Sequence, residues 1–160
     1  MKIKEFFKEL EELEVYKEFS VKYPDAYLCA GFFIFETGER EGDKFQFDFF
    51  IPSLEKIAIF EYPFSKFSIS EEAVKKCSPV DFGLKVDIDN LKEKIEEIKL
   101  ENEASQETSK IIAILRDNNW AITCLDNFLG ILKMKINALT GKCDDFEKGS
   151  LMDFMKIIKK

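Results

Sequence analysis

Two neighbouring segments rich in phenylalanine constrain the fold of this chain more than any other feature. Residues 26–36 are apolar at both even and odd positions, which is typical of a central strand covered on both faces. In the next segment Phe45, Phe47, Phe49 and Ile51 fall on one parity, which predicts a strand with one face in solvent. Because 17 of the 160 residues are Phe, we expect an aromatic core around these strands.

The rest of the N-terminal half predicts a helix before these strands and one strand after them. Apolar residues recur at helical spacing over residues 3–16, and Pro24 ends that helix. Residues 57–62 predict a third strand. Residues 70–86 show the weakest periodicity and are interpreted as a connection.

The C-terminal half repeats this order. Asp87 or Asp89 can cap a second helix with a narrow apolar stripe and a strongly acidic outer face. Three predicted strands follow, with Asn118-Asn119 as a two-residue hairpin turn between the first two. These strands span residues 110–116, 120–125 and 131–138.

We therefore predict an α+β fold built from two helix-plus-three-strand antiparallel units, residues 1–69 and 87–143, that share one pattern. Residues 70–86 connect the units within a single compact domain spanning residues 1–160. A short C-terminal helix is predicted over residues 150–159. The pattern does not show whether the halves are a true duplication.

Composition and charge exclude several classes of function. The chain contains no His, which removes His-dependent nucleophilic catalysis and His-ligated zinc. A net charge of −7, with Arg40 and Arg116 as its two arginines, argues against nucleic-acid binding. Glycines are dispersed, so the sequence contains no phosphate-binding loop. We expect no cofactor and no metal.

The chain also lacks the sequence signs of export. Its start is charged and amphipathic, and residues 26–35 are half the length that a membrane helix needs. Cys29, Cys77, Cys124 and Cys143 have no metal-site spacing and are interpreted as free thiols. These observations predict a cytoplasmic protein without a membrane span.

The closing segment, residues 136–143, reads Ile-Asn-Ala-Leu-Thr-Gly-Lys-Cys. With the helix and strands before it, over residues 88–143, it resembles the PepSY-type domains, whose repeats end in hydrophobic-Asp-Ala-x-Thr-Gly-Glu-hydrophobic. Asn137 and Lys142 replace the Asp and Glu of that motif. The resemblance implies a non-catalytic module associated with inhibition or regulation of partner proteins. In size, acidity and element order the chain is also similar to class I secretion chaperones, which implies a homodimer.

Four aromatic residues are candidates for an interface. Phe50, Phe60 and Tyr62 lie in strands where part of the aromatic set falls on the parity opposite the regular apolar row. Trp120 opens a strand after a turn, where its ring packs in the core or stands at a sheet edge. If helices leave one face of the sheet open, such residues expose an apolar surface that a partner or a second copy would cover.

The sequence thus favours a non-enzymatic protein-binding module, acting as an adaptor, inhibitor or regulator. One alternative is a small acidic chaperone-like homodimer. Another is a small-molecule binder or carboxylate-dependent enzyme, which would need two acids converging in a pocket. Asp48, placed by alternation on the wet face of its strand, is one candidate acid.

Overall fold

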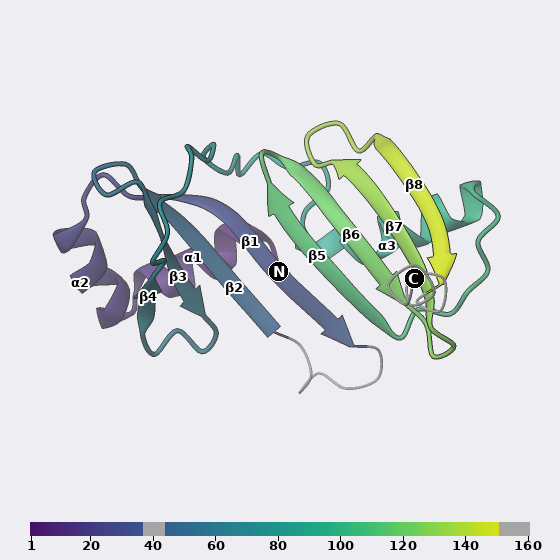
Figure 1. The fold of residues 1–160 in the computed structure, drawn as a ribbon, viewed down its shortest axis with the longest axis horizontal. Helices are drawn as coiled ribbons and strands as arrows, with labels where there is room; N and C mark the ends of the chain where they lie inside the picture. Colours follow the sequence, from purple (N-terminus) through teal and green to yellow (C-terminus); the bar gives the residue numbers. More distant parts are fainter. Residues whose placement is uncertain (37–43, 151–160) are drawn as a thin grey trace, which may run out of the picture.

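A single antiparallel sheet of eight strands, in the order β4-β3-β2-β1-β5-β6-β7-β8, organises the computed structural model (Figure 1). The structure describes residues 1–36 and 44–150. The first four strands are β1 (Tyr27–Glu36), β2 (Lys44–Ile51), β3 (Lys56–Glu61) and β4 (Phe67–Ile69). The other four are β5 (Lys110–Arg116), β6 (Asn119–Leu125), β7 (Gly130–Asn137) and β8 (Cys143–Ser150).

The prediction of two helix-plus-three-strand units is wrong, although the α+β class holds. Strands β1 and β5 pair from Ala30↔Arg116 to Glu36↔Lys110, which joins both halves into one continuous sheet. Each half also contributes a fourth strand, β4 or β8. Strand β1 is apolar on both parities, and such a strand is better placed at the centre of a sheet than at its edge. The structure places it there, between β2 and β5.

Strand β8 was missed because its residues are mostly polar. Its sequence, CDDFEKGS, carries charges that are common on edge strands, where they discourage pairing with another chain. Ser150 is the last residue of β8, and the remainder of the predicted helix 150–159 lies outside the described residues. The β5–β6 turn lies one residue earlier than predicted, at Asp117 and Asn118, both with positive φ.

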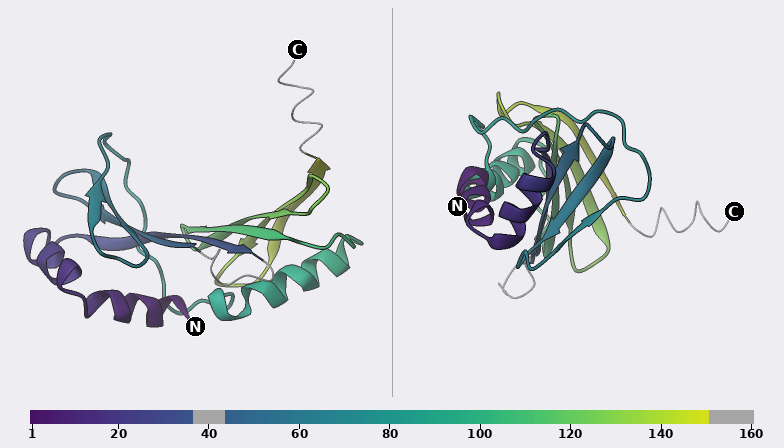
Figure 2. Two further views of the ribbon diagram at one scale, coloured as in Figure 1. Left: turned by 90° about the horizontal axis from the view of Figure 1, so that it is seen from below. Right: turned by 90° about the vertical axis from the view of Figure 1, so that its left-hand side faces the viewer.

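Three helices, α1 (Ile3–Glu11), α2 (Glu14–Lys22) and α3 (Ile88–Glu101), lie on one face of the sheet (Figure 2). The single helix predicted over residues 3–16 is two helices that meet at Glu12 and Leu13. Helix α3 begins at the predicted cap Asp87, whose carboxylate also accepts the Ile3 N–H at 2.9 Å. One buried carboxylate therefore links the starts of α1 and α3.

The main core fills the space between the helices and the sheet. It is aromatic, as expected, and many of its rings meet edge to face, as Phe19 and Phe60 do at 5.1 Å and 86°. Trp120 is fully buried on this side, and its Nε1 donates to the Val86 carbonyl at 2.8 Å. The helical side of the sheet is thus closed by its own chain.

The opposite side of the sheet, called here the open face, carries no helix of the described residues. Both ends of the sheet rise away from the helices, so the open face is concave (Figure 2, left). Part of the connection after β4 crosses one end of it, where Cys77 packs against Cys29, Ala30 and Phe50. The remaining surface of the open face is formed by the strands themselves.

Candidate functional site

The centre of the open face is an apolar patch of four residues, Phe32, Ile34, Ile112 and Ile114. Phe33 and Phe35 point into the core, so alternation directs Phe32 and Ile34 to the open face. The β1–β5 register places Phe32 opposite Ile114 and Ile34 opposite Ile112. Each of the four side chains is partly accessible to solvent, with Ile114 the most exposed at 37%. Two adjacent strands thus give one continuous apolar surface.

Polar and charged residues flank this apolar patch. On the β6 side, Ala121 and Thr123 continue the surface. Beyond them, Lys133 and Lys135 of β7 stand opposite Glu147 and Asp145 of β8, respectively. On the β2 side lie Gln46 and Asp48. An apolar centre within a polar rim is the common anatomy of a protein–protein interface.

Asp48 in this rim is only partly accessible, in contrast to the solvent-exposed position predicted for it. Burial raises the pKa of Asp48, while the amide of Gln46, which donates to its Oδ1 at 2.8 Å, and the charge of Arg116 act in the opposite direction. No described residue forms a salt bridge with Asp48. The negative charge of the Asp48 carboxylate on the open face is therefore balanced only in part.

A strap of residues 73–77 crosses the open face near the start of β1. Tyr27 Oη donates to the Cys77 carbonyl at 2.6 Å, and the Cys77 thiol donates to the Cys29 carbonyl at 3.3 Å. Farther along, the Val80 N–H donates to the Leu28 carbonyl at 3.0 Å. These bonds hold the strap and the segment after it against β1.

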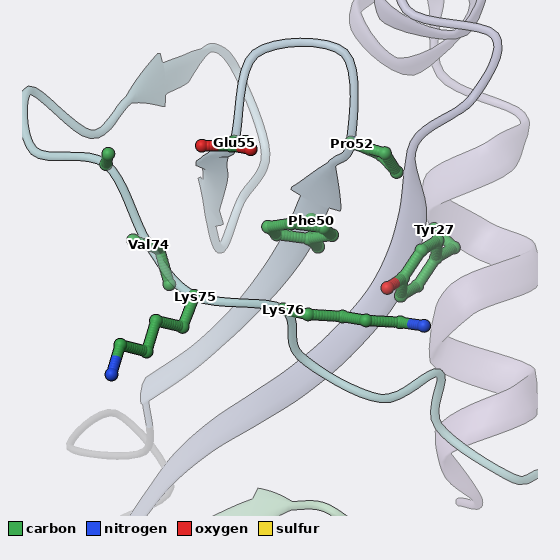
Figure 3. Close-up of a pocket in the computed structure, with 8 residues that line it drawn as sticks. Tyr27, Phe50, Pro52, Glu55, Val74, Lys75 and Lys76 are labelled. Carbon is green, nitrogen blue, oxygen red and sulfur yellow. The ribbon is translucent and has the colours of Figure 1, made fainter.

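Between the strap and the β2–β3 turn lies a cavity of about 700 Å³ (Figure 3). The ring of Phe50 lies at its centre, and the Lys76 side chain extends across it toward Tyr27. Glu55 lies on the turn side, and Lys75 points away from the cavity. The described lining holds one carboxylate, so it lacks the pair of converging acids that acid–base catalysis by carboxylates needs.

The four predicted interface residues do not share one surface. Phe60 and Trp120 are fully buried on the helical side, and Phe50 is 5% exposed beneath the cavity. Tyr62 is 56% exposed after β3, where its ring meets Phe45 and Phe64. The acidic helix α3 lies on the face opposite the open face.

Sequence reasoning missed the apolar patch because a signal was interpreted in the wrong way. Residues 26–36 are apolar on both parities, which predicted a strand covered on both faces. The structure places β1 centrally, but helices cover one side of it only. The same pattern therefore marks a strand that is buried on one side and available to a partner on the other.

Comparisons with known proteins show a fold but no family. No family model and no curated protein sequence matches this chain. A crystal structure of a protein from Clostridium difficile 630, described as a "putative lipoprotein", superposes with a TM-score of 0.52. At 11% identity it covers 84% of this chain and 90% of its own, so the two proteins share the architecture.

The described part of the chain shows neither a membrane-spanning helix nor a cluster of metal ligands. Its helices include none that is both long and apolar enough to cross a membrane. Its His, Cys, Asp and Glu side chains form no group of three or more that could hold a metal ion. Cys29, Cys77, Cys124 and Cys143 are free thiols in this structure.

Proposed function

We propose that this protein is a non-catalytic module that binds another protein through the open face of its sheet. The observation that carries this proposal is the apolar patch, an aromatic and aliphatic surface at the sheet centre that no described helix covers. Water is displaced favourably from such a surface when a partner covers it. Charged residues at the margins give the partner its orientation.

The concave shape supports a folded or extended polypeptide as the ligand. The cavity under the strap supplies a second contact at one end of the same face, large enough to accept a side chain from the partner. Four free thiols, three of them buried, support a reducing compartment such as the cytoplasm. A second copy of the chain is the competing occupant and is separated from a different protein by the experiment below.

The proposal is tested with two matched variants of the full chain. Ile114→Lys introduces a charge into the apolar patch, whereas Val21→Lys makes a comparable change at an exposed apolar residue on α2, on the helical side. Each tagged variant and the wild type are isolated from the native host and examined by native mass spectrometry at low salt. Melting temperatures establish that the variants remain folded.

We expect a stoichiometric protein partner with the wild type and with Val21→Lys, and its loss with Ile114→Lys. Each tenfold loss of affinity corresponds to about 1.4 kcal/mol, and one buried lysine in such a patch is expected to exceed that. A complex that survives Ile114→Lys contradicts binding through the open face. If the wild type is a homodimer and Ile114→Lys disrupts it, the open face is still the binding surface, but its occupant is a second copy of this chain and not a different protein.

A further inference from the structure

A second cavity lies on the helical side of the sheet, away from the open face. It has a volume of about 590 Å³ and lies between the second half of α3 and the segment leading into β5. Phe35, Ala104 and Ile111, all at least nine-tenths buried, supply an apolar floor. Its volume is within the range of about 300–1,000 Å³ that is usual for small-molecule sites.

The wall of this cavity contains a buried cation. Lys99 is 4% exposed, and its Nζ donates to Glu96 Oε1 at 3.1 Å and to Thr108 Oγ1 at 3.2 Å. A lysine ammonium has three N–H donors, so one has no partner among the described residues. The Glu96 side chain is 62% exposed and therefore offsets the buried charge incompletely. Lys99 Nζ can therefore donate a further hydrogen bond to an anionic group.

A buried acceptor lies in the same wall. Gln106 Oε1 is inaccessible to solvent and has no hydrogen-bond partner within the described structure. Leaving a buried acceptor unpaired is unfavourable, and a hydrogen bond from a ligand N–H would remove that penalty. The cavity thus combines an incompletely paired donor with an unpaired acceptor.

The remaining charges of the lining have both signs. Lys92 Nζ lies 4.9 Å from the centre of the Phe35 ring, and Glu107 lies beside Gln106 in the chain. Glu36 is also in the lining, and its Oε1 lies 3.8 Å from Lys110 Nζ. The lining therefore contains both Lys and Glu side chains, and a molecule that carries both charges can pair with each kind.

We propose that this cavity binds a small zwitterion with an apolar body, of the α-amino-acid type. Its carboxylate accepts a hydrogen bond from Lys99 Nζ. Its ammonium group lies beside the charge of Glu107, and the partly accessible Gln106 side chain changes rotamer to bring Oε1 to it. Its apolar side chain lies on Phe35 and Ile111. This site is separate from the open face and does not depend on the proposed protein-binding function.

The test uses three classes of probe with the unmodified full chain. Isothermal titration calorimetry compares L-leucine, L-methionine and L-phenylalanine with 4-methylpentanoate, which lacks the ammonium group, and with isoamylamine, which lacks the carboxylate. We expect at least one of the amino acids to bind, and both single-charge analogues to bind at least tenfold more weakly. Because the protein is unchanged, this comparison is independent of any effect on folding.

Variants then assign the contacts. Lys99→Met and Gln106→Met are each expected to weaken amino-acid binding at least tenfold, whereas Lys94→Met, on the same helix but outside the cavity lining, leaves it unchanged. Absence of binding by all three amino acids up to about 10 mM overturns the proposal. The proposal is also overturned if either single-charge analogue binds as tightly as the amino acids, or if Lys99→Met binds the amino acids as the wild type does.

Discussion

Trp120 shows how much of this fold depends on single buried residues. Its ring is fully buried and its indole N–H donates to the Val86 carbonyl, which lies just before α3. Trp120→Phe removes that donor and leaves unfilled space, so we expect a loss of about 1–3 kcal/mol in the free energy of unfolding. Urea denaturation measures this loss. The control is Tyr62→Phe at an exposed residue, which is expected to change the free energy of unfolding by less than about 0.5 kcal/mol.

Asp48 gives the open face a pH dependence. Burial raises the pKa of Asp48 above its ordinary value of 3.8, so the folded protein holds this proton to a higher pH than the unfolded chain does. The associated stabilisation is complete below the unfolded pKa and is lost as pH rises through the folded one. Asp48→Asn is therefore expected to be more stable than the wild type at neutral pH.

Denaturation at a series of pH values checks this sign. The advantage of Asp48→Asn should shrink as pH falls through the raised pKa, because both proteins then carry an uncharged side chain at this position. A variant that is less stable than the wild type at neutral pH would show that the charge of Asp48 is favourably paired, in disagreement with the structure.

At the scale of elements, Asp87 joins two helices that are far apart in sequence. Its carboxylate accepts the Ile88 N–H at 2.7 Å within the capping box of α3 and the Ile3 N–H at 2.9 Å at the start of α1. Loss of one helix cap costs about 0.5–2 kcal/mol, so Asp87→Ala, which removes both contacts, should cost about 2 kcal/mol or more.

Equilibrium unfolding of Asp87→Ala and Asp89→Ala provides the matched comparison. Asp89 is exposed in the first turn of α3 and makes no capping contact in the described structure, so its replacement should have a small effect. Equal effects of the two substitutions would mean that general charge near the helix start, and not the two hydrogen bonds of Asp87, provides the stabilisation.

Local pattern predicted most of these elements, and its failures have physical causes. Strands with alternating or continuous apolar residues, such as β1 and β2, were recognisable because burial on one or both faces selects that pattern. Strand β8 was not recognisable, because it is an edge strand with many charged residues. Such charges discourage pairing with another chain, and they leave no clear alternation of apolar and polar residues in the sequence. The break at Leu13 between α1 and α2 has no proline or glycine to signal it.

For the whole molecule, the pairing of β1 with β5 is the feature that sequence reasoning did not reach. Residues 30–36 and 110–116 lie far apart in the chain, and nothing local specifies that they join two meanders into one sheet. The apolar patch depends on this pairing, since each strand supplies half of it. The candidate site was therefore not predictable from Phe50, Phe60, Tyr62 or Trp120, which belong to other surfaces or to the core.

The central claim is that the apolar patch is the binding surface, and the most direct test is the affinity of the purified partner for single-residue variants. Phe32→Lys and Ile114→Lys should each weaken binding at least tenfold, by about 1.4 kcal/mol or more, with melting temperatures that show a folded protein. Val21→Lys on the helical side should bind as the wild type does. Wild-type affinity in both patch variants, or a loss confined to Val21→Lys, would contradict binding through the open face.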